Sequence, residues 1–131
     1  MPRRKKRRGH YHRGEYTSSK TQQVCRYRSG WELSLMQYLD SDPATATWSY
    51  ESVVIEYVSN ARTGKKRRYF PDFYVETASG ERQLIEVKPS KKLRQLAVAK
   101  KLSAAGDWCR DNQVTLRIIT EVELKELGLL K

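Results

Sequence analysis

The chain has 131 residues and a formal net charge of +11, from 26 Lys and Arg against 15 Asp and Glu. This length suits one domain with a single site, and the charge predicts an anionic partner, for which nucleic acid is the most common candidate. No apolar run matches a membrane span or a signal peptide, so we expect no membrane partner, and Cys25 and Cys109 have neither metal-site nor disulfide-framework spacing.

The first segment is strongly basic. Residues 1–20 carry eight Lys and Arg against Glu15 alone, which is +7 of the total charge. Such a charge without an apolar pattern favours disorder, so we expect residues 1–22 to form a disordered arm and residues 23–131 to form the folded domain. The arm is either a solvated tail or a set of phosphate contacts, and its candidate DNA-binding residues are Arg3, Arg4, Lys5, Lys6, Arg7 and Arg8.

A helix is expected at the start of the folded domain. Ser29 followed by Glu32 three residues later is the pattern of a capping box, which marks a helix N-terminus. Apolar side chains then recur at helical spacing as far as Asp40, ahead of Pro43. They are Trp31, Leu35, Tyr38 and Leu39.

Extended chain follows the helix. Residues 47–59 are rich in β-branched and aromatic side chains and predict one strand, or two short strands with a bend near Glu51. A very basic loop centred on Gly64 then leads to a strand over residues 68–76. These segments predict a β-meander.

The C-terminal half alternates between strand and helix. We expect a turn at residues 79–80, a strand over 83–88, a helix over 91–112, a strand over 114–120 and a short helix over 121–127. This order predicts an α/β fold with a mixed sheet flanked by helices. The side chains expected on the inner face of the long helix are Leu93, Leu96, Ala97 and Leu102.

Three charged residues interrupt the apolar pattern of two neighbouring strands. With a turn at residues 79–80, Asp72 lies opposite Val87, within about one residue of Glu86 and Lys88 across the ladder. Two carboxylates this close repel each other, and Mg²⁺, for which Mn²⁺ can substitute, would relieve the repulsion. The alternative is a surface ion pair of Glu86 with Lys88, but their apolar neighbours favour a buried site.

These residues also carry a family resemblance. Pro71 and Asp72, then thirteen residues, then "EVK" at 86–88 resembles the pattern of the PD-(D/E)xK nucleases. The stretches "YRSGWELSLMQYLD", "WSYESVVIEY", "RRYFPDFYV" and "IEVKP", in this order, resemble the head-completion nucleases of tailed, T4-like phages and, more distantly, the TnsA-type transposon endonucleases. The resemblance implies a restriction-endonuclease-like core with the order α-β-β-β-α-β.

The resemblance also implies site residues. It adds Glu32 to Asp72 and Glu86 as metal ligands, with Lys88 as the fourth catalytic residue. Glu32 has a rival role as the third residue of the capping box. Glu51 is a further candidate ligand, and its alternative is an outward residue on a bent strand.

Several basic and aromatic residues surround this pattern. Trp31, Trp48, Tyr50, Tyr57 and Tyr69 could stack on bases, although their spacing favours a role in the core. The basic residues would flank the metal site and contact DNA phosphates, or lie on solvated loops. They are Lys65, Lys66, Arg67, Arg68, Lys91 and Lys92.

The function expected from these observations is that of a Mg²⁺-dependent DNA endonuclease acting in phage head completion. Its implied partners are DNA and the portal or neck proteins of the phage, and its implied location is the cytoplasm of an infected bacterium or the virion. The alternatives are a structural DNA- or portal-binding protein with little activity, and a nuclease for transposon ends or junctions. A monomer and a dimer both remain open. Transposon-end cleavage and junction resolution would both normally need a partner or a dimer, and a monomer would argue most strongly against junction resolution.

Overall fold

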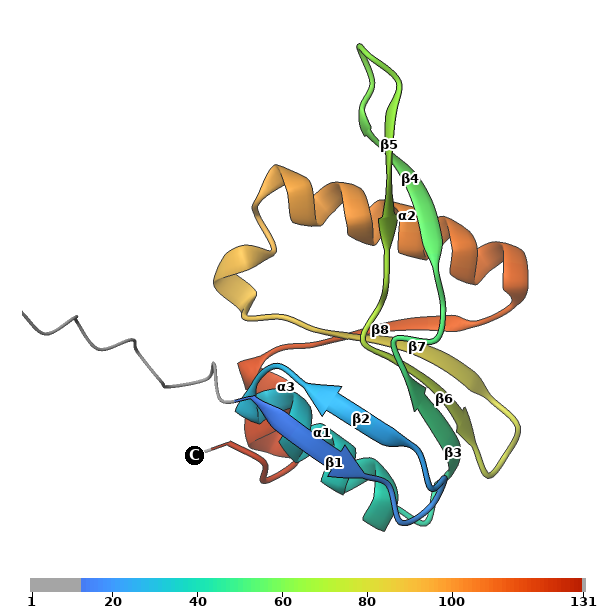
Figure 1. Cartoon of the computed structure of the whole chain (residues 1–131), viewed down its shortest axis with the longest axis vertical. Helices are drawn as coiled ribbons and strands as arrows, with labels where there is room; N and C mark the ends of the chain where they lie inside the picture. Colours follow the sequence, from blue (N-terminus) through green and yellow to red (C-terminus); the bar gives the residue numbers. More distant parts are fainter. Residues whose placement is uncertain (1–12, 131) are drawn as a thin grey trace, which may run out of the picture.

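The computed structural model describes residues 13–130, and its central element is a four-stranded sheet of order β3-β6-β7-β8 (Figure 1). Strand β6 pairs antiparallel with both β3 and β7, whereas β7 and β8 run parallel, as the two sides of a crossover through a helix. The mixed α/β fold expected from the sequence is therefore confirmed. The strands are β3 (Thr45–Tyr50), β6 (Phe73–Thr77), β7 (Arg82–Val87) and β8 (Thr115–Ile119).

Helices cover both faces of this sheet. Helices α1 (Gly30–Ser41) and α3 (Glu121–Glu126) share one core with it, in which Leu35, Phe73 and Ile85 are almost fully buried. Helix α2 (Leu96–Asn112) packs on the second core, around Leu84. Adjacent residues of β7 thus enter opposite cores, as the alternation of side chains along a strand requires. None of the helices in residues 13–130 has the length and apolar character needed to span a membrane.

The start of α1 agrees with the capping pattern. The Ser29 hydroxyl accepts a hydrogen bond from the backbone amide of Glu32 at 3.2 Å, which satisfies one of the free amides of the first turn. Leu35, Met36 and Leu39 then face the core. Helix α1 therefore has a defined first turn, and this turn places Glu32 at one end of the sheet.

The folded part begins earlier than predicted. Strands β1 (Gly14–Thr17) and β2 (Val24–Tyr27) form an antiparallel hairpin, so the arm expected over residues 1–22 is wrong for residues 14–22. Burial alternates along β2, and Cys25 and Tyr27 point into the core. These apolar contacts hold the hairpin on the domain, and the high charge of the segment gave no sign of them. Residues 1–12, which include the predicted arm contacts, lie outside the described part of the chain.

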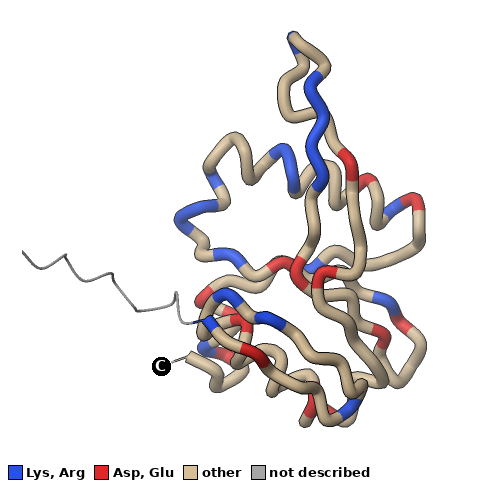
Figure 2. Tube along the Cα trace, in the orientation of Figure 1, with Lys and Arg blue, Asp and Glu red and all other residues tan. Residues whose placement is uncertain are grey.

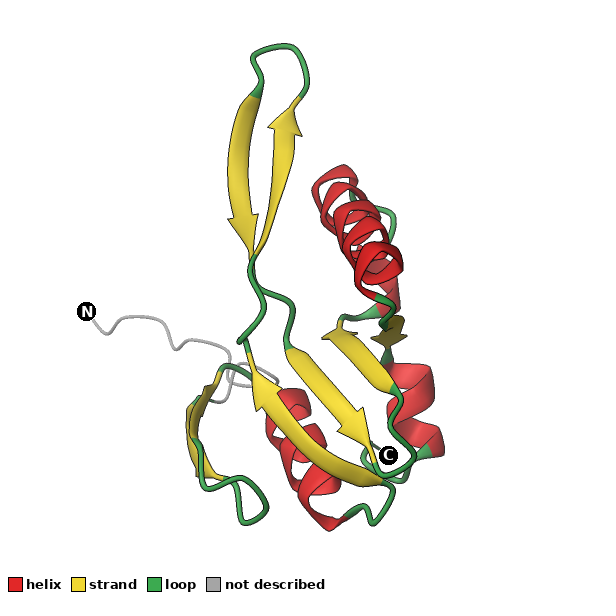
Figure 3. Ribbon diagram, turned by 90° about the vertical axis from the view of Figure 1, so that its right-hand side faces the viewer, coloured by secondary structure: helices red, strands yellow, loops and turns green. Residues whose placement is uncertain are grey.

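A second hairpin projects from the body, made of β4 (Ile55–Asn60) and β5 (Lys65–Tyr69) (Figures 1 and 3). Residues 47–59 therefore form two strands, with a break at Glu51, where φ is +53°. This confirms the two-strand alternative with a bend near Glu51. The single strand predicted over 68–76 is wrong, because it divides between β5 and β6 at Pro71, which has no amide for a ladder. The basic residues expected in a loop form β5 itself.

Helix α2 differs from the prediction in its start and in its inner face. Residues 90–92 form one turn of 3-10 helix, and the α-helix begins only at Leu96, whose side chain is 70% exposed. The buried residues are instead Val98, Ala105 and Cys109, at positions that share one face. Small side chains allow the helix to approach the sheet closely, which the leucine pattern does not indicate.

Candidate active site

Asp72 and Glu86 lie together at the end of the central sheet where the β4–β5 hairpin joins it. Strand β6 pairs Phe73 with Ile85, one step from the predicted register, which brings Asp72 next to Glu86. The Asp72 amide donates to Oε1 of Glu86 at 3.3 Å, and Oδ2 of Asp72 accepts from the Val87 amide at 2.8 Å. Each carboxylate is thus held by the backbone of the opposite strand.

The two acids share a desolvated environment. Asp72 is 7% exposed and Glu86 is 5% exposed. Burial and the nearby Glu86 carboxylate raise the pKa of Asp72 well above its usual value, and burial also raises the pKa of Glu86, against the opposing effects of Tyr69 and Lys88. The arrangement therefore holds two negative charges that a further cation would stabilise.

Lys88 lies where the sequence predicted it, just after β7 and beside Glu86. Its Nζ is 3.5 Å from Oε2 of Glu86, and its amide extends the parallel ladder by donating to Ile119 at 3.0 Å. The side chain is 25% exposed, so its ammonium group faces both the acid pair and solvent. A cation in this position can contact an anionic substrate at the edge of the site.

Glu32 combines its two predicted roles only in part. Its Oε1 accepts hydrogen bonds from the Arg28 amide and the Tyr50 hydroxyl, both at 2.8 Å. The carboxylate therefore caps the helix, although at the amide one residue before the expected Ser29. Glu32 is buried and close enough to Asp72 to raise the pKa of that acid.

Glu51 completes a group of acids that affect one another. It follows β3, and its amide donates to the carbonyl of Asp72 at 2.9 Å. Burial raises the pKa of Glu51, and so do the charges of Glu32 and Glu86, while an ion pair with Arg28 at 2.9 Å opposes these effects. The outward alternative for Glu51 is wrong, because its side chain is only 20% exposed and pairs with Arg28.

Three further residues belong to this site: Arg28 was not among the candidates from sequence, and Tyr50 and Tyr69 were candidates only for base stacking or the core. Arg28 pairs with Glu51, and Tyr50 donates to Glu32. The buried hydroxyl of Tyr69 lies beside Glu86, and burial together with that carboxylate raises the pKa of Tyr69. The position of Tyr50 directly before Glu51 could have indicated its contact with the acids, whereas no local signal marks Arg28 or the contact of Tyr69 with Glu86.

The donor set of the site suits a hard divalent cation. Within residues 13–130, no group of three or more His, Cys, Asp or Glu side chains is arranged to hold a metal. The buried pair of Asp72 and Glu86 nevertheless offers carboxylate oxygens, and Mg²⁺ is commonly bound by one or two carboxylates together with substrate phosphate. The geometry therefore fits a cation held by this pair.

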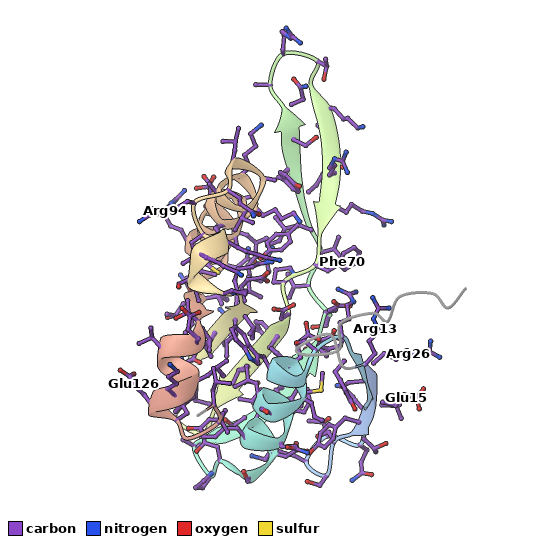
Figure 4. The ribbon with its side chains drawn as sticks, turned by 90° about the vertical axis from the view of Figure 1, so that its left-hand side faces the viewer. Arg13, Glu15, Arg26, Phe70, Arg94 and Glu126 are labelled. Carbon is purple, nitrogen blue, oxygen red and sulfur yellow. The ribbon has the colours of Figure 1, made fainter. Side chains whose placement is uncertain are left out.

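Basic residues lie on two sides of the acids. Figure 2 shows acidic segments gathered where the hairpin meets the sheet, with basic segments along the hairpin and in the region that precedes α2. Residues 65–68 are exposed on β5, and Arg68 lies 5.8 Å from the ring of Phe70 at the hairpin base (Figure 4). Lys91 is exposed and Lys92 half-buried, and Arg94 points outward just before α2 (Figure 4).

Two similarities to known proteins fit this geometry. Residues 42–121 match the family model described as the TnsA-like endonuclease N-terminal domain. The chain is also 46% identical over 124 residues to the head completion nuclease of Enterobacteria phage T4, an alignment that covers 78% of this chain and 82% of that protein. The matched family segment includes Glu51, Asp72, Glu86 and Lys88 but begins after Glu32.

Proposed function

This chain belongs to the family of TnsA-like endonucleases. From that membership and from its 46% identity to the head completion nuclease of phage T4, we propose that it is a phage head-completion nuclease that cuts DNA with the help of a divalent metal. The observation that carries the metal-dependent mechanism is the buried pair of Asp72 and Glu86 beside Lys88. Two buried carboxylates side by side, next to basic residues, are suited to hold a cation against a phosphodiester.

Asp72 and Glu86 are the proposed metal ligands. Hydrogen bonds from the Val87 and Asp72 amides orient their carboxylates before any substrate arrives, so little reorganisation is needed during the reaction. A bound divalent cation would stabilise negative charge on the phosphate and lower the pKa of a coordinated water. We propose Mg²⁺ as the natural ion, with Mn²⁺ able to replace it.

Lys88 is proposed to stabilise the charge that develops on the phosphate. Its ammonium group is partly exposed and held near the acid pair by Glu86. Glu32 is proposed as the third acid of the site, kept in place by Tyr50 and the Arg28 amide. Glu51 supports the same group from the break after β3, where Arg28 balances its charge.

DNA is the proposed substrate, held by its phosphates on both sides of the acids. Lys65, Lys66, Arg67 and Arg68 would contact the backbone from the projecting hairpin, and Lys91 and Lys92 from the turn after β7. Such contacts position a duplex without reading its sequence. The arm residues Arg3, Arg4, Lys5, Lys6, Arg7 and Arg8 would add affinity of the same kind.

The proposed setting is the completion of phage heads in an infected bacterium, with portal or neck proteins as partners. This setting follows from the relative in phage T4, whose name states head completion. Cutting DNA at a filled head would require the enzyme to act near the point of packaging.

The test is cleavage of circular and single-stranded DNA with Mg²⁺, Mn²⁺ or EDTA. We expect metal-dependent cleavage by the wild type, and a loss of about 100-fold or more in Asp72→Asn, Glu86→Gln and Lys88→Ala, because the first two changes each remove a proposed metal ligand and the third removes the ammonium group that would stabilise charge on the phosphate. Asp111→Asn is a matched control, since Asp111 is an exposed acid near the end of α2.

The control variant should cleave at the wild-type rate. Full cleavage by folded Asp72→Asn would contradict the proposed site. Failure of a folded, DNA-binding wild type to cleave with any metal would instead favour the structural head-completion role. A complementation assay separates these functions, because only the structural role would survive Glu86→Gln.

A further inference from the structure

A cavity of about 450 Å³ opens next to Lys88. It lies between the N-terminal end of α1, the end of β7 and the 3-10 turn that precedes α2. Its volume is within the range of pockets that bind small ligands. Because Lys88 lines the cavity and also pairs with Glu86, the cavity adjoins the proposed catalytic site.

The lining combines an aromatic ring with several cations. Trp31 is half-buried, packs against the core beneath α1 and also lines the cavity. Lys88, Lys91 and Lys92 line it as well, and Val87 and Pro89 add apolar surface. An aromatic surface beside ammonium groups matches the two parts of a nucleotide, a flat base and an anionic phosphate.

Glu121 is an acidic residue in the lining, and its carboxylate already accepts hydrogen bonds from Ser90 in the 3-10 turn. The Ser90 amide donates to its Oε1 at 2.9 Å, and the Ser90 hydroxyl donates to its Oε2. These hydrogen bonds connect the start of α3 to the turn that carries Lys91 and Lys92. The lysines are therefore held at the cavity, and the Glu121 charge is partly compensated by its donors.

We propose that this cavity binds one unpaired nucleotide of the substrate strand, with its base against Trp31 and its phosphate at Lys91 and Lys92. The inference rests on the proposed nuclease function and specifies the substrate. A paired base cannot stack on a side chain without leaving the duplex, which requires unstacking and unpairing. The enzyme should therefore prefer DNA that is single-stranded or gapped next to the cut.

The test measures binding in EDTA, so that no cleavage is needed. Fluorescence anisotropy compares a labelled oligothymidylate of about 12 nucleotides with a duplex of the same length. Trp31→Leu retains an apolar side chain but no aromatic face, whereas Trp31→Phe retains the face. We expect Trp31→Leu to lose about tenfold in affinity for the single strand, Trp31→Phe much less, and both to change duplex affinity little.

Two further measurements complete the experiment. Lys91→Ala with Lys92→Ala should weaken single-strand binding and reduce its salt dependence, since fewer phosphates are neutralised on binding. Thermal melting verifies that each variant is folded, and Trp108→Phe, in the other core, is the matched control with wild-type affinity. Thymidine monophosphate as competitor distinguishes a strand-binding site from a site for free nucleotides.

The outcomes separate this inference from the proposed function. Equal affinities of folded Trp31→Leu and Trp31→Phe for the single strand would overturn the stacking contact. Displacement of the oligothymidylate by an equal concentration of the mononucleotide would overturn its assignment to a strand. A Trp31-dependent preference in a protein that never cleaves DNA would support the cavity and contradict the nuclease.

Discussion

Asp72 and Glu86 are buried at positions where their ionised carboxylates destabilise the folded state. Burial and mutual repulsion raise the pKa of Asp72, and burial raises that of Glu86, above the values of an unfolded chain. As the pH rises past the unfolded values, near about 4, the folded state retains protons that the unfolded state has lost, so stability falls. Such a cost is common where residues serve catalysis rather than folding.

Neutralising one of these acids should therefore stabilise the protein. We expect Asp72→Asn to raise the melting temperature at pH 7 by about 4 °C, equivalent to about 1 kcal/mol in a domain of this size. The difference from wild type should disappear below about pH 4, where the acids are protonated in both states. Differential scanning calorimetry across this pH range measures both effects.

The effect of divalent metal on the melting temperature should differ between the wild type and Asp72→Asn. Mg²⁺ should raise the melting temperature of the wild type, because a ligand that binds only the folded state stabilises it. It should have little effect on Asp72→Asn, and the exposed control Asp111→Asn should respond like the wild type. An equal Mg²⁺ response of wild type and Asp72→Asn would contradict a cation bound by the acid pair.

At the scale of elements, Asp40 attaches the β1–β2 hairpin to the rest of the fold. Its carboxylate accepts hydrogen bonds from the Ser18 hydroxyl at 2.6 Å, the Ser19 amide at 2.8 Å and the Trp48 indole at 2.9 Å, and also from the Tyr16 hydroxyl. Burial raises the pKa of Asp40, but these hydrogen bonds outweigh burial and lower it to about 2. One side chain at the end of α1 thus contacts the first hairpin and the central sheet.

Acid should loosen this attachment first. The pKa of Asp40 is lowered in the folded state, so its contribution is present above the unfolded value near about 4 and is lost as the pH falls toward 2. Asp40→Ala should lower stability at pH 7 by about 2 kcal/mol, because the Trp48 indole loses its acceptor. Urea unfolding measures this loss, and faster hydrogen exchange in β1 and β2 locates it.

The same hairpin offers a control. Arg26→Ala removes an exposed ion pair with Glu15 on β1 and should change stability by less than about 0.5 kcal/mol. If Asp40→Ala exchanged no faster than Arg26→Ala within β1 and β2, the carboxylate would not be the attachment point.

At the scale of the whole molecule, charge and shape act together. The acids lie at the junction between the sheet and the projecting β4–β5 hairpin, and the exposed residues 65–68 of β5 lie on that projection (Figures 1 and 2). The hairpin is secured to α2 by Lys100, which donates to the Ser59 carbonyl at 2.8 Å, and by the buried Ile55 and Tyr69 at its base. A firm base would hold the basic strand in a defined position for the DNA contacts proposed above.

The salt dependence of DNA affinity tests how much the N-terminal residues and the hairpin each contribute to phosphate binding. Removing residues 1–12 should flatten the slope of log affinity against log salt by about 0.7–0.9 for each phosphate that the protein no longer neutralises. Replacing Lys65 and Lys66 by Ala should flatten it by a smaller amount, because fewer cations are removed. Anisotropy at several salt concentrations measures both slopes, and an unchanged slope after the truncation would assign the arm to another partner.

Prediction from sequence succeeded where the signal was local. The cap at Ser29 marked the start of α1, and the alternation along β7 placed Glu86 and Lys88 near Asp72. It failed where distant contacts decided the outcome. Residues 14–17 form a strand because β2 and Asp40 bind them, and α2 buries Ala105 rather than Leu96 because the sheet lies close to that side.

The sequence by itself determined the acids, the lysine and the positive charge, because residue type and spacing along a strand are local properties. Only the tertiary structure decided how these groups meet. In the fold, β6 and β7 pair one residue away from the predicted register, and Glu51 is largely buried at a left-handed position. Trp31 on α1 and Lys88 after β7 line the same cavity. Each of these depends on packing between segments far apart in the chain, which no local pattern encodes.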